Sequence, residues 1–145
     1  MKAVIQRVKH TSLKVDGELI SEIPCGLAVY LGVKAGDVPA KAEAMAKKIA
    51  ALRIFEDGNG KMNLSVADAG GEILLISQFT LYGDCSHGNR PSFTEAERPE
   101  AANALYELTA RKLRENGMTV KTGVFGADMK IEQFNDGPVT IIYEI

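Results

Sequence analysis

Two runs of uninterrupted apolar residues constrain the fold of this chain more than any other feature. Residues Gly26–Val33 are nearly all apolar, and Ile73–Ile76 are entirely so. A strand with one face in water alternates apolar and polar residues, whereas a continuous apolar run indicates a strand covered on both faces. We therefore expect both runs to be central strands of a sheet that is packed on both sides.

Further strands are expected at the two ends of the chain. Residues Lys2 to Ile23 should form two strands joined at Asp16-Gly17, a dipeptide typical of tight hairpin turns. Two short strands are expected at Met129–Phe134 and Val139–Ile145. The residues between them, Asn135-Asp136-Gly137-Pro138, should form a sharp turn.

Two segments have helical periodicity. The first is Val38 to Leu52, where Asp37 is placed to cap the first turn and the apolar stripe is Ala42, Met45, Ile49 and Leu52. The second runs from about Pro99 to Asn116, with Gly117 just beyond its end and Ala101, Leu105 and Leu108 on one side. A turn is expected between the first helix and the second apolar run, at Glu56–Gly60.

The composition fits one domain over residues 1–145, with 46% hydrophobic and 25% charged residues. The fold class is α/β: a single compact domain in which strand-rich mixed sheets pack with two main helices. Cys25 and Cys85 lack the neighbours of a disulfide framework or a zinc site. The longest apolar run is too short to span a membrane and the N-terminus is charged early, so we expect a cytoplasmic protein. The net charge of −2 argues against broad coating of nucleic acid but permits contact with one RNA end.

The common catalytic motifs are missing from the sequence. It has no GxSxG, HExxH, GxGxxG or phosphate-binding glycine loop, and Cys85 with His87 is too close in sequence to favour a nucleophile–base pair. Polar residues follow the second apolar run instead, at Ser77, Gln78 and Thr80. They either face a cleft or only bond to their own backbone.

Two further positions have more than one interpretation from the residues alone. Arg7 shares a strand face with Ala3 and Ile5, so it is either paired and inward-facing or turned to solvent by a bulge. The Gly137-Pro138 bond would ordinarily be trans, since only about 5–6% of such bonds in folded proteins are cis.

Two motifs, Ser77-Gln78-Phe79-Thr80-Leu81 and Asn135-Asp136-Gly137-Pro138-Val139-Thr140, resemble the signature motifs of D-aminoacyl-tRNA deacylases. The resemblance extends, in the same order, to residues 3–8, 53–55, 60–64, 89–93 and 125–129. It implies layers of two sheets and helices, no cofactor or metal, and a homodimer with active sites at the subunit interface. The loop Asp84–Gly88, with Cys85 and His87, departs from the family pattern.

The resemblance also implies roles for individual residues. Ser77, Gln78, Phe79 and Thr80 would line the site around the ester. Gly137-Pro138 would be cis and would reach into the partner's pocket as a chiral filter, held by Arg7. The remaining residues implied to contribute to the pocket wall are Phe125, Ala127 and Met129.

The expected reaction is hydrolysis of the ester between tRNA and a D-amino acid or glycine, with L-aminoacyl-tRNA rejected. The protein needs mainly to position the ester and stabilise the oxyanion, for which the backbone amides of Phe79 and Thr80 are candidates. Attack by water assisted by the ribose 2′-hydroxyl is favoured over attack by Thr80, which lacks an evident base. The alternatives are a non-catalytic RNA-binding module and a small-molecule esterase.

Overall fold

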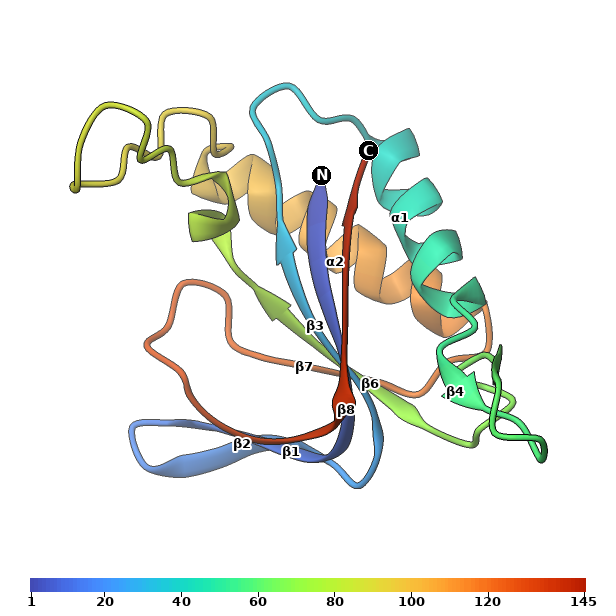
Figure 1. Cartoon of the computed structure of the whole chain (residues 1–145). Helices are drawn as coiled ribbons and strands as arrows, with labels where there is room; N and C mark the ends of the chain where they lie inside the picture. Colours follow the sequence, from blue (N-terminus) through green and yellow to red (C-terminus); the bar gives the residue numbers. More distant parts are fainter.

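Strand β1 (Lys2–Val15) organises the main sheet, because three other strands pair with it. The computed structural model describes residues 1–145 (Figure 1). The other elements, in chain order, are β2 (Glu18–Ile23), β3 (Gly26–Gly32), α1 (Pro39–Ala51), β4 (Phe55–Glu56), β5 (Met62–Leu64), β6 (Glu72–Ser77), the 3₁₀ helix η1 (Phe79–Tyr82), α2 (Pro99–Glu115), β7 (Val120–Thr122) and β8 (Lys130–Glu144).

The sheet has the order β2-β1-β3-β6-β7, and β8 pairs with the other edge of β1. It curls until β2 and β7 approach each other. There the Ser21 hydroxyl donates to the carbonyl of Thr122 at 2.7 Å, and Lys121 Nζ donates to the carbonyl of Glu22 at 2.6 Å. These side-chain bonds join the two ends of the sheet, which is therefore a nearly closed barrel.

The two apolar runs form β3 and β6, which are parallel neighbours in the middle of the sheet, as predicted. Leu27, Val29 and Leu31 point to a core shared with the helices, whereas Ala28 points into a second core within the curled sheet. The side chains of β6 alternate in the same way. Continuous hydrophobicity is thus explained by cores on both faces.

Helices α1 and α2 cover one face of the sheet (Figure 1). Each begins at a proline and buries one stripe of residues; the buried residues are Ala42, Met45, Ala46 and Ile49 on α1, and Ala102, Leu105, Tyr106, Thr109, Ala110 and Leu113 on α2. The predicted stripe on α2 was wrong at Ala101, which is exposed. The α/β class, with two main helices packed on strand-rich sheets, is confirmed. No helix has the length and apolar character needed to cross a membrane.

The expected cap of α1 was also wrong. Val38 is the capping position and makes no side-chain capping bond. The Asp37 carboxylate instead lies 2.7 Å from the Met1 ammonium group and 2.8 Å from Lys41 Nζ, and it accepts a hydrogen bond from the backbone N–H of Lys34. Burial raises the pKa of Asp37, but the hydrogen bonds and the ammonium group outweigh this effect and hold the pKa below its usual value.

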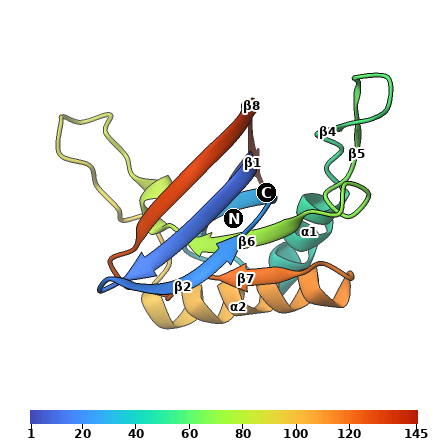
Figure 2. The same cartoon turned by 90° about the horizontal axis from the view of Figure 1, so that it is seen from below.

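The hairpin turns occur where the sequence predicted them. Asp16 and Gly17 both have positive φ, 50° and 84°, as a tight two-residue hairpin turn requires. The turn at residues 56–60 joins β4 to β5, two short strands that the sequence did not predict. This hairpin projects away from the main sheet (Figure 2).

The end of the chain differs from the prediction. The two short strands expected around a turn at residues 135–138 are one strand, β8, which runs alongside β1 for most of the length of both (Figure 2). The pairing changes register between the pairs Gln6–Thr140 and Val8–Asn135. Arg7 on β1 therefore faces four residues of β8, Asp136–Val139, which form a bulge rather than a chain reversal.

Candidate functional site

A cavity of about 690 Å³ opens where the parallel strands β3 and β6 end. Ligand sites in open α/β sheets commonly lie beyond the carboxyl ends of parallel strands. Its walls come from β3, β6, η1, the segment before α2, the first turns of α2, and the loop between β7 and β8. The lining residues are mostly apolar: Leu31, Val33, Ile76, Ser77, Gln78, Phe79, Phe93, Ala96, Glu97, Arg98, Pro99, Ala102, Tyr106, Phe125, Gly126, Ala127, Asp128, Met129 and Ile131.

The predicted segment Ser77–Thr80 lies at the edge of this cavity. β6 ends at Ser77, and the chain turns at once into η1. Ser77, Gln78 and Phe79 line the cavity, while Thr80 is the next, exposed residue. The first N–H groups of a helical turn have no acceptor within the helix, so the amides of Phe79 and Thr80 are available to a ligand.

Thr80 has no proton acceptor suited to activate it among its hydrogen bonds. The side-chain amide of Gln78 donates to Thr80 Oγ1, and an amide donor does not take up a proton. Phe79 is 58% exposed although its ring packs edge-on against Phe93, with ring centroids 5.1 Å apart. The ring of Phe79 therefore lies at the mouth of the cavity, partly in solvent.

The opposite wall is built by α2 and the loop that follows β7. Tyr106 is 3% exposed and donates its hydroxyl to the carbonyl of Leu75 at 2.8 Å, which fixes its ring beside Phe125. Burial raises the pKa of Tyr106, so its hydroxyl stays protonated and able to donate. Phe125, Ala127 and Met129 line the cavity on this side, where the resemblance had assigned them.

Gly137 and Pro138 do not line this cavity. They lie in the bulge of β8, and the peptide bond between them is cis. The φ of Gly137 is 122°, and a side chain there would place its Cβ 2.9 Å from the backbone nitrogen of Val139. Only glycine fits this position, so the bulge presents bare main chain.

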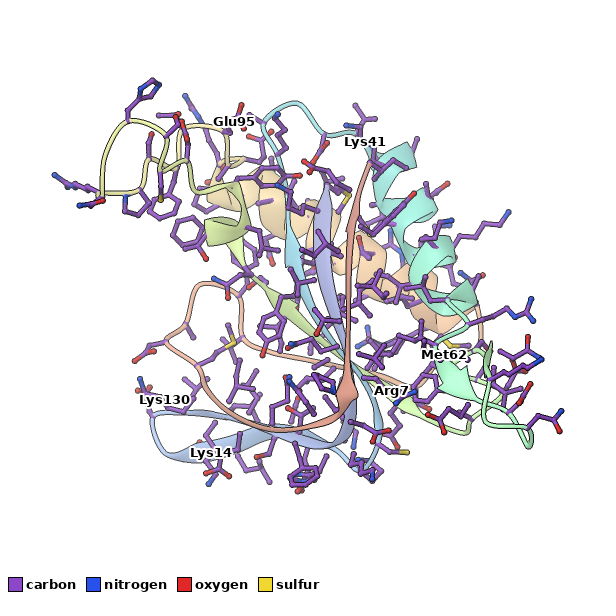
Figure 3. The ribbon with its side chains drawn as sticks, viewed as in Figure 1. Arg7, Lys14, Lys41, Met62, Glu95 and Lys130 are labelled. Atoms are coloured by element: carbon purple, nitrogen blue, oxygen red, sulfur yellow. The ribbon has the colours of Figure 1, made fainter.

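Arg7 holds the bulge in place from within the protein. It is 6% exposed, and its Nη1 donates to the carbonyl of Ile54 at 2.8 Å. Its Nε lies 3.1 Å from the carboxylate of Asp136 and 3.3 Å from the carbonyl of the same residue. Arg7 is therefore inward-facing and paired (Figure 3), and its Nη2 also lies 3.9 Å from the carboxylate of Glu56 on β4.

Several cavity residues were not identified from the sequence. Tyr106 lies on the buried stripe of α2, and Phe93 lies in the segment between the loop Asp84–Gly88 and α2. Neither position has a sequence pattern that distinguishes a ligand-binding wall from ordinary packing. Cys85 is exposed and neither it nor His87 lines the cavity. The structure contains no group of three His, Cys, Asp or Glu side chains that could hold a metal ion.

Comparison with protein families gives a match over almost the entire chain. A family model described as D-Tyr-tRNA(Tyr) deacylase matches residues 4–144. The chain is 55% identical over 144 residues to a D-aminoacyl-tRNA deacylase of Anaeromyxobacter dehalogenans, which covers 99% of this chain and 97% of that protein. It is 51% identical over 145 residues to a D-aminoacyl-tRNA deacylase of Rhodopirellula baltica, with 100% of both chains covered.

Solved structures resemble the fold as a whole. One, described as c-Myc DNA Unwinding Element Binding Protein, has a TM-score of 0.93 and 44% identity, covering 100% of this chain and 99% of that one. Another, described as "a probable eukaryotic D-amino acid tRNA deacylase", has a TM-score of 0.84 and 17% identity, covering 99% and 98%. At 17% sequence identity, the second structure shows only that the fold is shared.

The buried position of Arg7 yields a test of its anchoring role. Replacing Arg7 with Met should lower the free energy of unfolding by about 3 kcal/mol, because the Ile54 carbonyl and Asp136 lose a buried donor. Lys9→Met is the matched control, since Lys9 Nζ lies 3.5 Å from the same carboxylate but its side chain is 65% exposed. The control should lose less than about 1 kcal/mol. Equal losses in urea unfolding would contradict this assignment.

Proposed function

This chain belongs to the D-Tyr-tRNA(Tyr) deacylase family, and from that membership we propose how it selects and hydrolyses its substrate. It is a D-aminoacyl-tRNA deacylase and hence a hydrolase. The bond it cleaves is the ester between the 3′-terminal ribose of tRNA and a D-amino acid or glycine. The cavity beside η1 receives the aminoacylated end of the tRNA, and L-aminoacyl-tRNA is excluded from it.

The observation that carries the proposal is the separation of two parts of one chain. Ser77–Thr80 border the cavity, whereas Gly137 and Pro138 lie outside its lining and are held by Arg7 beside Ile54. A chain cannot bring its own bulge to its own cavity without breaking these contacts. The active form is therefore a homodimer in which each bulge reaches the cavity of the other subunit, as an isologous two-fold contact allows.

Exclusion supplies the energy that chiral selection needs. A discrimination of about 10⁴ requires about 5.4 kcal/mol, since each tenfold factor is about 1.36 kcal/mol. Attraction alone is too weak for this, because even one extra methylene in an apolar pocket changes the binding free energy by only about 1–3 kcal/mol. Rigid main chain placed against the α-carbon instead clashes with an L side chain. Because Gly137 has no side chain and the bulge is anchored, it suits this role, and glycine esters pass it.

Hydrolysis itself needs positioning and oxyanion stabilisation, because an aminoacyl ester is already activated. The amides of Phe79 and Thr80 stabilise the oxyanion. Thr80 is not the nucleophile, because its side-chain hydrogen bond is to the amide of Gln78 and not to a general base. Water attacks the ester, and the neighbouring 2′-hydroxyl of the terminal ribose helps to activate it.

The substrate range tests the proposal directly. Purified protein should deacylate D-tyrosyl-tRNA and glycyl-tRNA and leave L-tyrosyl-tRNA and L-alanyl-tRNA charged, as measured by release of labelled amino acid. Glycyl-tRNA as resistant as L-alanyl-tRNA would refute the exclusion mechanism. Binding without release would indicate an RNA-binding module, and release from both tyrosyl enantiomers would indicate a general esterase.

The nucleophile is tested by two changes, one in the protein and one in the RNA. Thr80→Ala should keep a rate within about tenfold of the wild type, because the hydroxyl does not attack the ester. A tRNA ending in 2′-deoxyadenosine should be hydrolysed at least about a hundredfold more slowly, a typical loss for a missing acid–base group. The proposal fails if Thr80→Ala abolishes turnover while the deoxy substrate reacts normally.

A further inference from the structure

The bulge of β8 is fastened on a second face of the sheet, opposite Arg7. Gln6 precedes Arg7 on β1, so the two side chains point to opposite faces. Gln6 pairs with Thr140, the first residue after the bulge, and the last pair before the bulge contains Asn135. The two ends of the bulge therefore lie within reach of one group of polar side chains.

Two side-chain amides connect these ends. Gln6 Nε2 donates to the hydroxyl of Thr140 at 3.3 Å. Gln133 Nε2 donates to Gln6 Oε1 at 2.8 Å and also to the side-chain oxygen of Asn135. The chain of bonds thus runs from Asn135, before the bulge, through both glutamines to Thr140, after it. We call Gln6 and Gln133 the amide clamp.

Tyr30 of β3 sets the orientation of the clamp. Its hydroxyl donates to Gln133 Oε1 at 3.1 Å, so the Nε2 group of Gln133 faces Gln6 and Asn135. Burial raises the pKa of Tyr30, which keeps the hydroxyl protonated. Tyr30, Gln6 and Gln133 are half-buried, so the bonds among these three are partly shielded from water, whereas the bonds to Asn135 and Thr140 lie at the surface.

We propose that the amide clamp of Gln6 and Gln133 is a positioning element that sets the stereoselectivity of the enzyme by fixing both ends of the Gly137–Pro138 bulge. This inference rests on the proposed filter. Arg7 holds Asp136, the first residue of the bulge, from one face, and the clamp holds the flanking residues Asn135 and Thr140 from the other. Without the clamp the bulge can move away from the α-carbon of the substrate, so L substrates gain access while hydrolysis at the cavity continues.

The experiment compares variants that differ in the bonds they retain. Gln6→Leu removes both bonds of Gln6, whereas Gln6→Glu keeps an acceptor for Gln133 and a second acceptor for the Thr140 hydroxyl. Ser21→Ala is the stability control, because it removes a hydrogen bond between β2 and β7 that lies outside the clamp. The readout is the ratio of kcat/KM for L-tyrosyl-tRNA to that for D-tyrosyl-tRNA.

The ratio should rise about tenfold or more in Gln6→Leu, equivalent to about 1.4 kcal/mol of lost discrimination, and stay within about threefold of the wild type in Gln6→Glu and Ser21→Ala. A rise of less than about threefold in Gln6→Leu, or an equal rise in Gln6→Glu, overturns the proposal. If Gln6→Leu does not fold, Tyr30→Phe, which removes only the orienting hydroxyl, is judged by the same threshold.

Amide hydrogen exchange separates failure of the clamp from failure of the proposed function. In Gln6→Leu the backbone amides of residues 135–137 and 139 should exchange faster, while those of β3 and β6 stay unchanged. Unchanged exchange at residues 135–137 and 139 overturns the clamp. If the wild-type protein does not hydrolyse D-tyrosyl-tRNA, the proposed function fails. The exchange rates still report whether the clamp holds the bulge.

Discussion

The buried guanidinium of Arg7 is the contact on which the arrangement of the site depends. It joins the interior of β1 to the carbonyl of Ile54 and to the carboxylate and carbonyl of Asp136. Since an unpaired buried charge costs several kcal/mol, these partners cannot leave without destabilising the protein. The bulge that carries Gly137 and Pro138 is therefore attached to β1, the strand with which three others pair, although the bulge lies at the protein surface.

The same strand also separates the two halves of the proposed active site. The apolar strands β3 and β6 end at the cavity, where η1 and α2 complete its walls. β8 follows β1 along the other edge of the sheet and carries the bulge. In the proposed enzyme, hydrolysis and chiral exclusion thus depend on different regions of the chain, and a second copy of the chain brings these regions together.

Much of the fold could be predicted because its signals are local. Continuous hydrophobicity in Gly26–Val33 and Ile73–Ile76 predicted central strands, and helical periodicity predicted α1 and α2. The continuity of β8 could not be predicted, since Asn135–Pro138 has the composition of a turn and only pairing with the distant β1 makes it a bulge. Asp37 is a residue type that commonly caps helices and stands just before α1, but its carboxylate pairs with the Met1 ammonium group and Lys41 instead.

For the site, the resemblance pointed to two segments that contribute to the cavity lining, Ser77–Phe79 and Phe125–Met129, but periodicity alone did not. The positions of Tyr106 and Phe93 in the cavity wall could not be predicted, because cavity walls and packed cores contain the same types of side chain. The hydrogen bond between the side-chain amides of Gln6 and Gln133 could not be predicted either, because it joins strands at opposite ends of the sequence.

The most direct measurement of the central claim is the selectivity of mixed dimers. Chains with Arg7→Met, whose filter is released, are refolded with a large excess of Ala127→Trp chains, whose cavity is filled. Each open cavity then faces the intact bulge of a blocked chain. The account predicts that L-tyrosyl-tRNA hydrolysis by the Arg7→Met chains disappears while D-tyrosyl-tRNA hydrolysis remains. Persistent hydrolysis of L-tyrosyl-tRNA in the mixture would contradict it, because the filter would then act within a single chain.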